Sequence, residues 1–198
     1  MERHGFFRRW DAIDPVLYET SDHIAFVTLH RPEAGNRLTP SGVAGLRAAW
    51  ERFADDDAVD IAILTGIGGH FCAGADASVG AAVAAQRRAR KPVIAAINGR
   101  TAGRGLELAL ACRTRIASAD ASFGSLDWKH GVCANPRARE LARVVGMGPL
   151  KQLALGREPR DAGWAARHGI VHDVVAGADL IAAAEHLADR ATRAHFAA

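Results

Sequence analysis

The chain has 198 residues, of which 49% are hydrophobic and 24% charged, and a formal net charge of +3, values typical of one soluble globular domain. No segment approaches the ~18–20 uninterrupted apolar residues of a membrane helix, so a membrane-spanning protein is not expected. The N-terminus lacks the apolar core of an export signal, which favours a location in the cytoplasm. The basic residues form no stripe interleaved with aromatics, so we expect an acidic small-molecule ligand and no nucleic acid.

The N-terminal part of the chain predicts a tail, a hairpin and a helix. Residues 1–14 are expected to form a loosely held tail before a single domain over 15–198. Residues 16–19 and 23–30 predict a β-hairpin, because the second segment alternates and is rich in β-branched residues. Apolar residues then recur at spacings of three and four, which predicts a helix capped by Thr39.

The rest of the chain alternates apolar runs with helical patterns. The expected elements are a strand at 59–64, a glycine-rich turn at 66–76, a helix at 77–90, a strand at 92–97, a helix at 103–112, a strand at 114–117, helices near 136–145, 149–155 and 160–168, a strand at 171–175 and a helix at 177–193. Strands that alternate with helices through short connections favour an α/β fold with a parallel sheet.

The cysteines are Cys72, Cys112 and Cys133, an odd number at unrelated spacings. They form no C-x-x-C motif and no cluster with histidines, so neither a metal site nor a disulfide framework is expected. We predict reduced thiols, two of them in the core.

Two segments carry most of the functional information. HFCAGAD at 70–76 and KPVIAAINGRTAGRGLE at 91–107 each end an apolar run in a turn of small residues. The second turn continues into a helix that opens with a carboxylate. This arrangement exposes backbone N–H groups and places an acid or base beside them.

These segments resemble the enoyl-CoA hydratase/isomerase family, the crotonases, which has F-C-A-G-A-D at the first turn and K-P-V-I-A-A-[IV]-N-G with G-G-G-x-E at the second. The resemblance extends to about residue 176. It implies an α/β fold of the crotonase-like ββα spiral type, an acyl-CoA or carrier-protein thioester as substrate, and no separate cofactor, since CoA is part of the substrate. The reaction implied passes through an enolate whose oxygen is held by two backbone N–H groups.

The resemblance assigns these two N–H donors to Ala75 and Arg104. Arg104 stands where the family usually has glycine, so the N–H is retained but an arginine side chain must find room, and a backbone with φ above zero would be strained. Substrate contacts are implied for further residues of both turns: Ala73, Gly74, Asp76, Ala77, Ser78 and Gly103.

Two carboxylates are the expected catalytic residues. Glu107 lies one turn inside its helix, so its side chain points back toward the helix start, and the resemblance identifies it with one of two glutamates that hold a water. The other glutamate position is occupied by Asp127, one methylene shorter, with Leu126 in place of the family's proline. A misplacement of about 1 Å can cost roughly 100-fold in rate. Asp127 therefore shares the water, marks a different reaction, or is a loop aspartate without a catalytic role.

Other segments match the family or depart from it. RPEAGNRL at 31–38 resembles the loop over the adenine of CoA, which makes Arg31 and Ala34 expected ligand neighbours. The span between Asp76 and Lys91 is shorter than usual, and the chain ends where relatives continue into two or three helices that close the pocket and form trimers. We expect a short, divergent member, truncated at these trimerisation helices, that forms a homo-oligomer, by the resemblance a trimer.

The preferred interpretation is an enzyme acting on an acyl-CoA, most simply by hydration of a 2-enoyl-CoA, with isomerisation as a related reaction. One alternative is a catalytically silent crotonase-like binding subunit, which Arg104, Asp127 and the altered segment at 131–139 favour. Another is a specialised biosynthetic crotonase that acts as a decarboxylase or thioester hydrolase. The sequence does not identify the acyl group.

Overall fold

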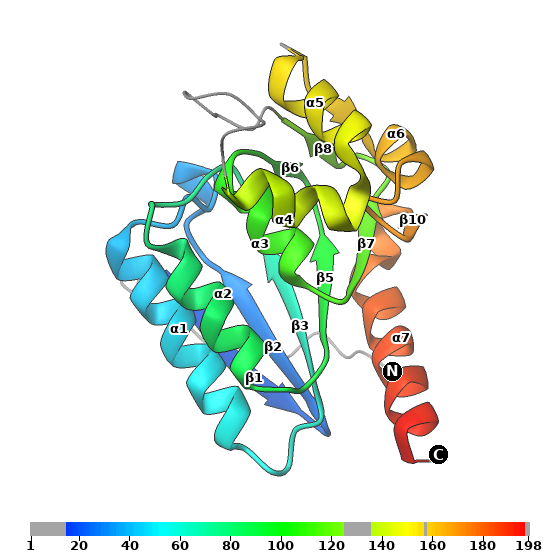
Figure 1. The fold of residues 1–198 in the computed structure, drawn as a ribbon. Helices are drawn as coiled ribbons and strands as arrows, with labels where there is room; N and C mark the ends of the chain where they lie inside the picture. The colour runs from blue at the N-terminus through cyan, green and yellow to red at the C-terminus, as the bar shows by residue number, and fades with distance from the viewer. Residues whose placement is uncertain (1–14, 125–135, 157, 197–198) are drawn as a thin grey trace.

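The computed structural model describes residues 15–124, 136–156 and 158–196, so the predicted tail at 1–14 lies outside the described residues. The chain folds into a large sheet, a small sheet and surrounding helices (Figure 1). The large sheet contains, in order across it, β1 (Val16–Ser21), β2 (Ile24–Leu29), β3 (Ile61–Gly66), β5 (Val93–Ile97), β7 (Thr114–Ser118) and β10 (Asp173–Val175). The small sheet contains β4 (His70–Cys72), β6 (Arg100–Thr101), β8 (Ser122–Phe123) and β9 (Arg160–Asp161).

The pairing in the large sheet follows the predicted pattern. β1 and β2 form an antiparallel hairpin, and every later neighbour in the sheet pairs in parallel. All residues of β3 and β5 are buried, which explains the continuous apolar runs at residues 61–64 and 93–97. The prediction of an α/β fold with a parallel sheet is confirmed.

Helices cover both faces of the large sheet. They are α1 (Pro40–Asp55), α2 (Val79–Arg88), α3 (Arg104–Ala111), α4 (Pro136–Val145), α5 (Met147–Leu155), α6 (Ala162–Arg167) and α7 (Leu180–Phe196), with the 3-10 turns η1 (Pro32–Ala34) and η2 (Gly177–Asp179). α1 and α2 lie on one face, while α7 crosses the other (Figure 1). Thr39 caps α1 as predicted, because its hydroxyl accepts a hydrogen bond from the Gly42 N–H at 3.2 Å.

The apolar patterns of these helices explain where they pack. On α1, Leu46, Trp50 and Phe53 are fully buried against the core on one side of the sheet. On α7, Leu180 and Ala184 join the isoleucines of the central strands in a second cluster on the opposite side. The fold is therefore held by two apolar layers with the sheet between them.

The structure differs from the predicted elements mainly where the chain turns. The expected turn at 66–76 contains strand β4, and residues 160–161 of the expected helix at 160–168 form strand β9 before α6 begins. These strands are two or three residues long, which is too short for an alternation of apolar and polar residues to be recognised in the sequence. No helix among the described residues is long and apolar enough to cross a membrane.

Candidate active site

The two small-residue turns leave paired strands at the same edge of the small sheet. β4 pairs with β6 in parallel, with Cys72 opposite Thr101. Because parallel strands end at the same edge, residues 73–76 and 102–104 emerge side by side. The Ala102 N–H donates a hydrogen bond to the Cys72 carbonyl at 3.0 Å, which ties the two turns together.

The start of α3 lies against the first turn. Gly105 packs on the backbone of Cys72 so closely that a Cβ atom at Gly105 would overlap the Cys72 carbonyl oxygen. Gly103 precedes the helix with φ of +54°, a conformation that L side chains rarely adopt. The close approach of α3 to this turn therefore requires glycine at position 105, while the positive φ favours glycine at position 103.

The N–H groups of Ala75 and Arg104 face no acceptor among the described residues. Arg104 is the first residue of α3, so its N–H has no carbonyl within the helix to bond to. Ala75 sits between Gly74, whose carbonyl accepts from the Leu38 N–H, and Asp76, whose N–H donates to the Leu38 carbonyl. Neither N–H group donates to another described residue, and that of Arg104 lies at the positive end of the helix dipole.

The arginine side chain at position 104 is accommodated outside the turn. Its Nη1 donates to the Ala77 carbonyl at 3.4 Å, and Arg104 has no positive φ, because Gly103 takes that conformation instead. The Ser78 hydroxyl and N–H donate to the Asp76 carboxylate at 2.7 and 2.9 Å, and with Arg104 nearby they lower the pKa of Asp76. The backbone strain considered for Arg104 does not occur.

The loop at 31–38 is fastened to the first turn by Asn36. This buried side chain accepts a hydrogen bond from the Arg31 N–H at 2.8 Å and donates to the carbonyls of Ile67 and His70 at 2.9 and 2.6 Å. The Ala73 N–H also donates to the Gly35 carbonyl at 2.9 Å. These bonds bring the predicted ligand neighbours at positions 31 and 34 to the same side of the fold as the turns.

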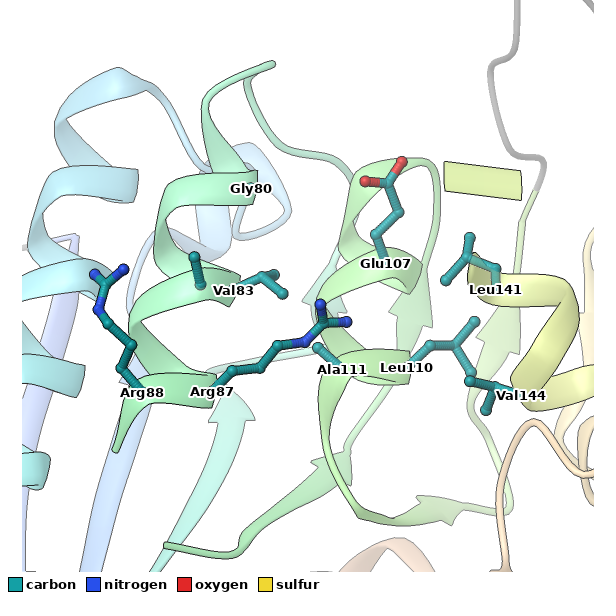
Figure 2. Close-up of a pocket in the computed structure, with 10 residues that line it drawn as sticks. Gly80, Val83, Arg87, Arg88, Glu107, Leu110, Ala111, Leu141 and Val144 are labelled. Carbon is teal, nitrogen blue, oxygen red and sulfur yellow. The ribbon is translucent and has the colours of Figure 1, made fainter. Parts of the chain in front are cut away.

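Glu107 lines a cavity of about 340 Å³ between α2, α3 and α4. It lies one turn inside α3, half-buried, and its carboxylate points toward the start of the helix, as predicted (Figure 2). The cavity is lined by Gly80, Val83, Ala84, Arg87, Arg88, Glu107, Leu110, Ala111, Leu141 and Val144. Most of these side chains are apolar, so the cavity suits an organic group held beside one carboxylate.

The cavity residues on α2 and α4 were not identified from the sequence. Gly80, Val83 and Arg87 recur at spacings of three and four, which predicts one helix face, but nothing local shows what that face meets. Asp127 and Cys133 lie outside the described residues, as does part of the altered segment at 131–139. Cys72 and Cys112 are buried free thiols, and the described residues contain no group of side chains able to hold a metal.

Comparisons with known proteins agree with this architecture. The chain matches the family Enoyl-CoA hydratase/isomerase over residues 19–90 and 83–198. It is 37% identical to an (E)-benzylidenesuccinyl-CoA hydratase from Thauera aromatica, covering 89% of this chain and 75% of the relative, and 33% identical to a short-chain-enoyl-CoA hydratase from Clostridium acetobutylicum, covering 90% and 75%.

Solved structures give the same result. An enoyl-CoA hydratase from Mycobacterium marinum superposes with a TM-score of 0.81 at 35% identity, covering 91% of this chain and 89% of the other. A monofunctional enoyl-CoA isomerase from M. smegmatis superposes with a TM-score of 0.81 at 33% identity, covering 89% and 84%.

Proposed function

The chain belongs to the enoyl-CoA hydratase/isomerase family, and we propose that it hydrates a 2-enoyl-CoA thioester. Enoyl-CoA hydratases are among its relatives, and the two turns and Glu107 are the residues that the family resemblance assigns to this reaction. Water would add across the double bond, with its oxygen joining the β-carbon and a proton reaching the α-carbon.

Negative charge in this reaction develops on the thioester oxygen. The N–H groups of Ala75 and Arg104 are proposed to hold that oxygen as the enolate forms, each contributing on the order of 2.7–4 kcal/mol. The close packing of Gly105 on Cys72 supports this role, since it fixes the start of α3 beside the first turn. Preorganised donors need no rearrangement during the reaction, so their effect falls on the transition state.

Glu107 is proposed to be the general base and acid. Its carboxylate would take a proton from the attacking water and return one to the α-carbon, work that contributes about 10²–10⁴-fold in comparable enzymes. Asp127 is proposed to share the same water with Glu107. The position of Glu107 supports this role, because it lines the cavity and lies one helical turn from the N–H of Arg104.

The observation that carries this proposal is the parallel pairing of β4 with β6, which leads both turns and α3 to one edge. The test is a hydration assay with crotonyl-CoA, followed by loss of the enoyl thioester absorbance. Measurable turnover that requires Glu107 is expected. Tight binding of crotonyl-CoA without any turnover would instead identify a silent binding subunit.

A second candidate is movement of the double bond between the 3- and 2-positions of an enoyl-CoA. This reaction needs one carboxylate that shuttles a proton and the same oxyanion site, and Glu107 alone meets the first need. The M. smegmatis relative is an isomerase. Conversion of a 3-enoyl-CoA with no hydration of crotonyl-CoA would favour this reaction.

The resemblance also predicts a homo-oligomer, and a trimer in particular. Sedimentation of the purified protein would measure its oligomeric state.

A further inference from the structure

We propose that the acyl group of the substrate carries a second negative charge, a carboxylate at its far end, and that Arg87 binds it. This inference rests on the proposed function, because it takes the cavity beside Glu107 as the acyl site. It concerns the part of the cavity away from the reacting atoms.

The two helices that form the cavity set its direction. α2 begins after the first turn and α3 begins after the second, and both run away from the turns in the same direction (Figure 2). Residues later in each helix therefore lie farther from the thioester. Arg87 follows Gly80 by seven residues, which places it about 10 Å along the axis of α2. It stands at the end of the cavity opposite the turns.

The cavity is apolar between these two ends. Val83 from α2, Leu110 from α3 and Leu141 from α4 contribute to its wall. Figure 2 shows the Arg87 side chain reaching from α2 toward Ala111 of α3. An acyl chain that starts at the turns would thus pass apolar walls and end at a guanidinium.

A guanidinium at this position selects for a carboxylate. Its planar fork matches the two oxygens of a carboxylate, and its five N–H donors allow it to bind a ligand while it keeps another interaction. Arg88 adds a second positive charge to the lining, and Glu107 is the only acidic residue among the described residues that line the cavity. A purely hydrocarbon chain would gain nothing from these charges and would have to desolvate them.

The competing explanation is that Arg87 only offsets the dipole at the C-terminal end of α2, where Arg88 also lies. That role needs a positive charge but no contact with substrate. It predicts that replacing Arg87 has the same effect on every acyl group.

The test compares two thioesters of equal carbon number, 2-hexenoyl-CoA and the mono-CoA thioester of 2-hexenedioic acid. We expect wild type to have a kcat/KM about 10-fold higher for the dicarboxylic substrate, since a charge-assisted bidentate contact at a partly exposed site is of this order. Arg87→Gln should reduce the ratio of the two values to about 1, and Arg87→Lys should keep part of the preference. A wild-type ratio at or below 1, or equal losses for both substrates in Arg87→Gln, would overturn the proposal.

Arg143→Gln is the matched control, because it removes the same charge from an exposed position of α4 outside the cavity lining. It should leave the ratio unchanged, and a similar drop would mean that net charge, not contact, sets the preference. Affinities of the two saturated thioesters, measured by calorimetry, separate this inference from the proposed function. If neither enoyl thioester is turned over, the proposed hydration is contradicted, while a preference for the dicarboxylic ligand that Arg87→Gln removes would still support the contact.

Discussion

The carbonyl oxygen of Cys72 lies against the Cα atom of Gly105, in the space that a side chain at Gly105 would occupy. One residue ends β4 and the other lies in the first turn of α3, so this contact sets the spacing between the two proposed oxyanion donors.

Gly105→Ala should destabilise the protein by about 1–3 kcal/mol, because the new methyl group must displace α3 or the Cys72 turn. Since a shift of about 1 Å can cost roughly 100-fold in rate, turnover should fall much more than acyl-CoA affinity. Urea unfolding and crotonyl-CoA kinetics measure the two effects. Gly148→Ala is the control, because a Cβ atom there meets nothing within 4 Å in α5, and it should retain full activity.

Glu107→Gln should lower kcat by at least ~100-fold with little change in acyl-CoA affinity, because the amide cannot transfer a proton while CoA is held elsewhere. Steady-state kinetics and calorimetry with a saturated acyl-CoA measure the two quantities. The same change in Glu51, an exposed residue of α1, should have no effect on either. Unchanged turnover in Glu107→Gln would make this carboxylate structural.

Asp127 separates hydration from the other reactions. If it shares a water with Glu107, Asp127→Asn should abolish hydration, and Asp127→Glu should preserve or raise it by restoring the reach of the family's glutamate. Crotonyl-CoA hydration by the purified variants measures this. Equal rates in wild type and Asp127→Ala would remove Asp127 from the site and favour isomerisation or a binding role.

Stability should decrease at alkaline pH because of two buried thiols. Burial raises the pKa of Cys72 to about 11 and that of Cys112 to about 12. In the unfolded chain both thiols have a pKa of about 8.5, so the unfolded state loses its protons at a lower pH than the folded state. The free energy of unfolding is therefore highest below that pH and decreases as the pH rises toward the pKa values of the folded protein. The slope should reach about 1.4 kcal/mol per pH unit for each thiol.

Urea unfolding at a series of pH values from neutral to alkaline measures this slope. Cys112→Ala should be less stable at neutral pH, since it loses buried atoms, but its stability should fall less steeply with pH. If the variant keeps the wild-type slope, Cys112 does not contribute to the pH dependence of stability.

The sequence predicted the helices and strands that are specified by residues close together along the chain. Thr39 was identified as a helix cap because its hydroxyl is followed by a proline and an amphipathic pattern, and the structure confirms it. The continuous apolar runs in β3 and β5 likewise indicated buried parallel strands. In each case the residues that carry the signal are neighbours along the chain.

The small sheet and the cavity could not be predicted in this way. β4 and β6 are too short to show a period, and they exist because residues about thirty positions apart pair with each other. The approach of Arg87 to α3 depends on how two helices pack, which no local pattern in the sequence indicates. The sequence motifs thus located both turns, while the shape of the cavity follows from the tertiary structure.

The three hydrogen bonds of the Asn36 side chain have an energetic consequence for the proposed enzyme. One of them orders the loop expected to meet the nucleotide, and the other two join this loop to Ile67 and to His70 of β4, the strand that leads into the first turn. In the proposed enzyme, contacts made far from the reacting carbon atoms would orient the thioester, because the same rigid frame would hold both ends of the ligand. Shortened thioesters that lack the nucleotide should therefore react more slowly even when they saturate the site.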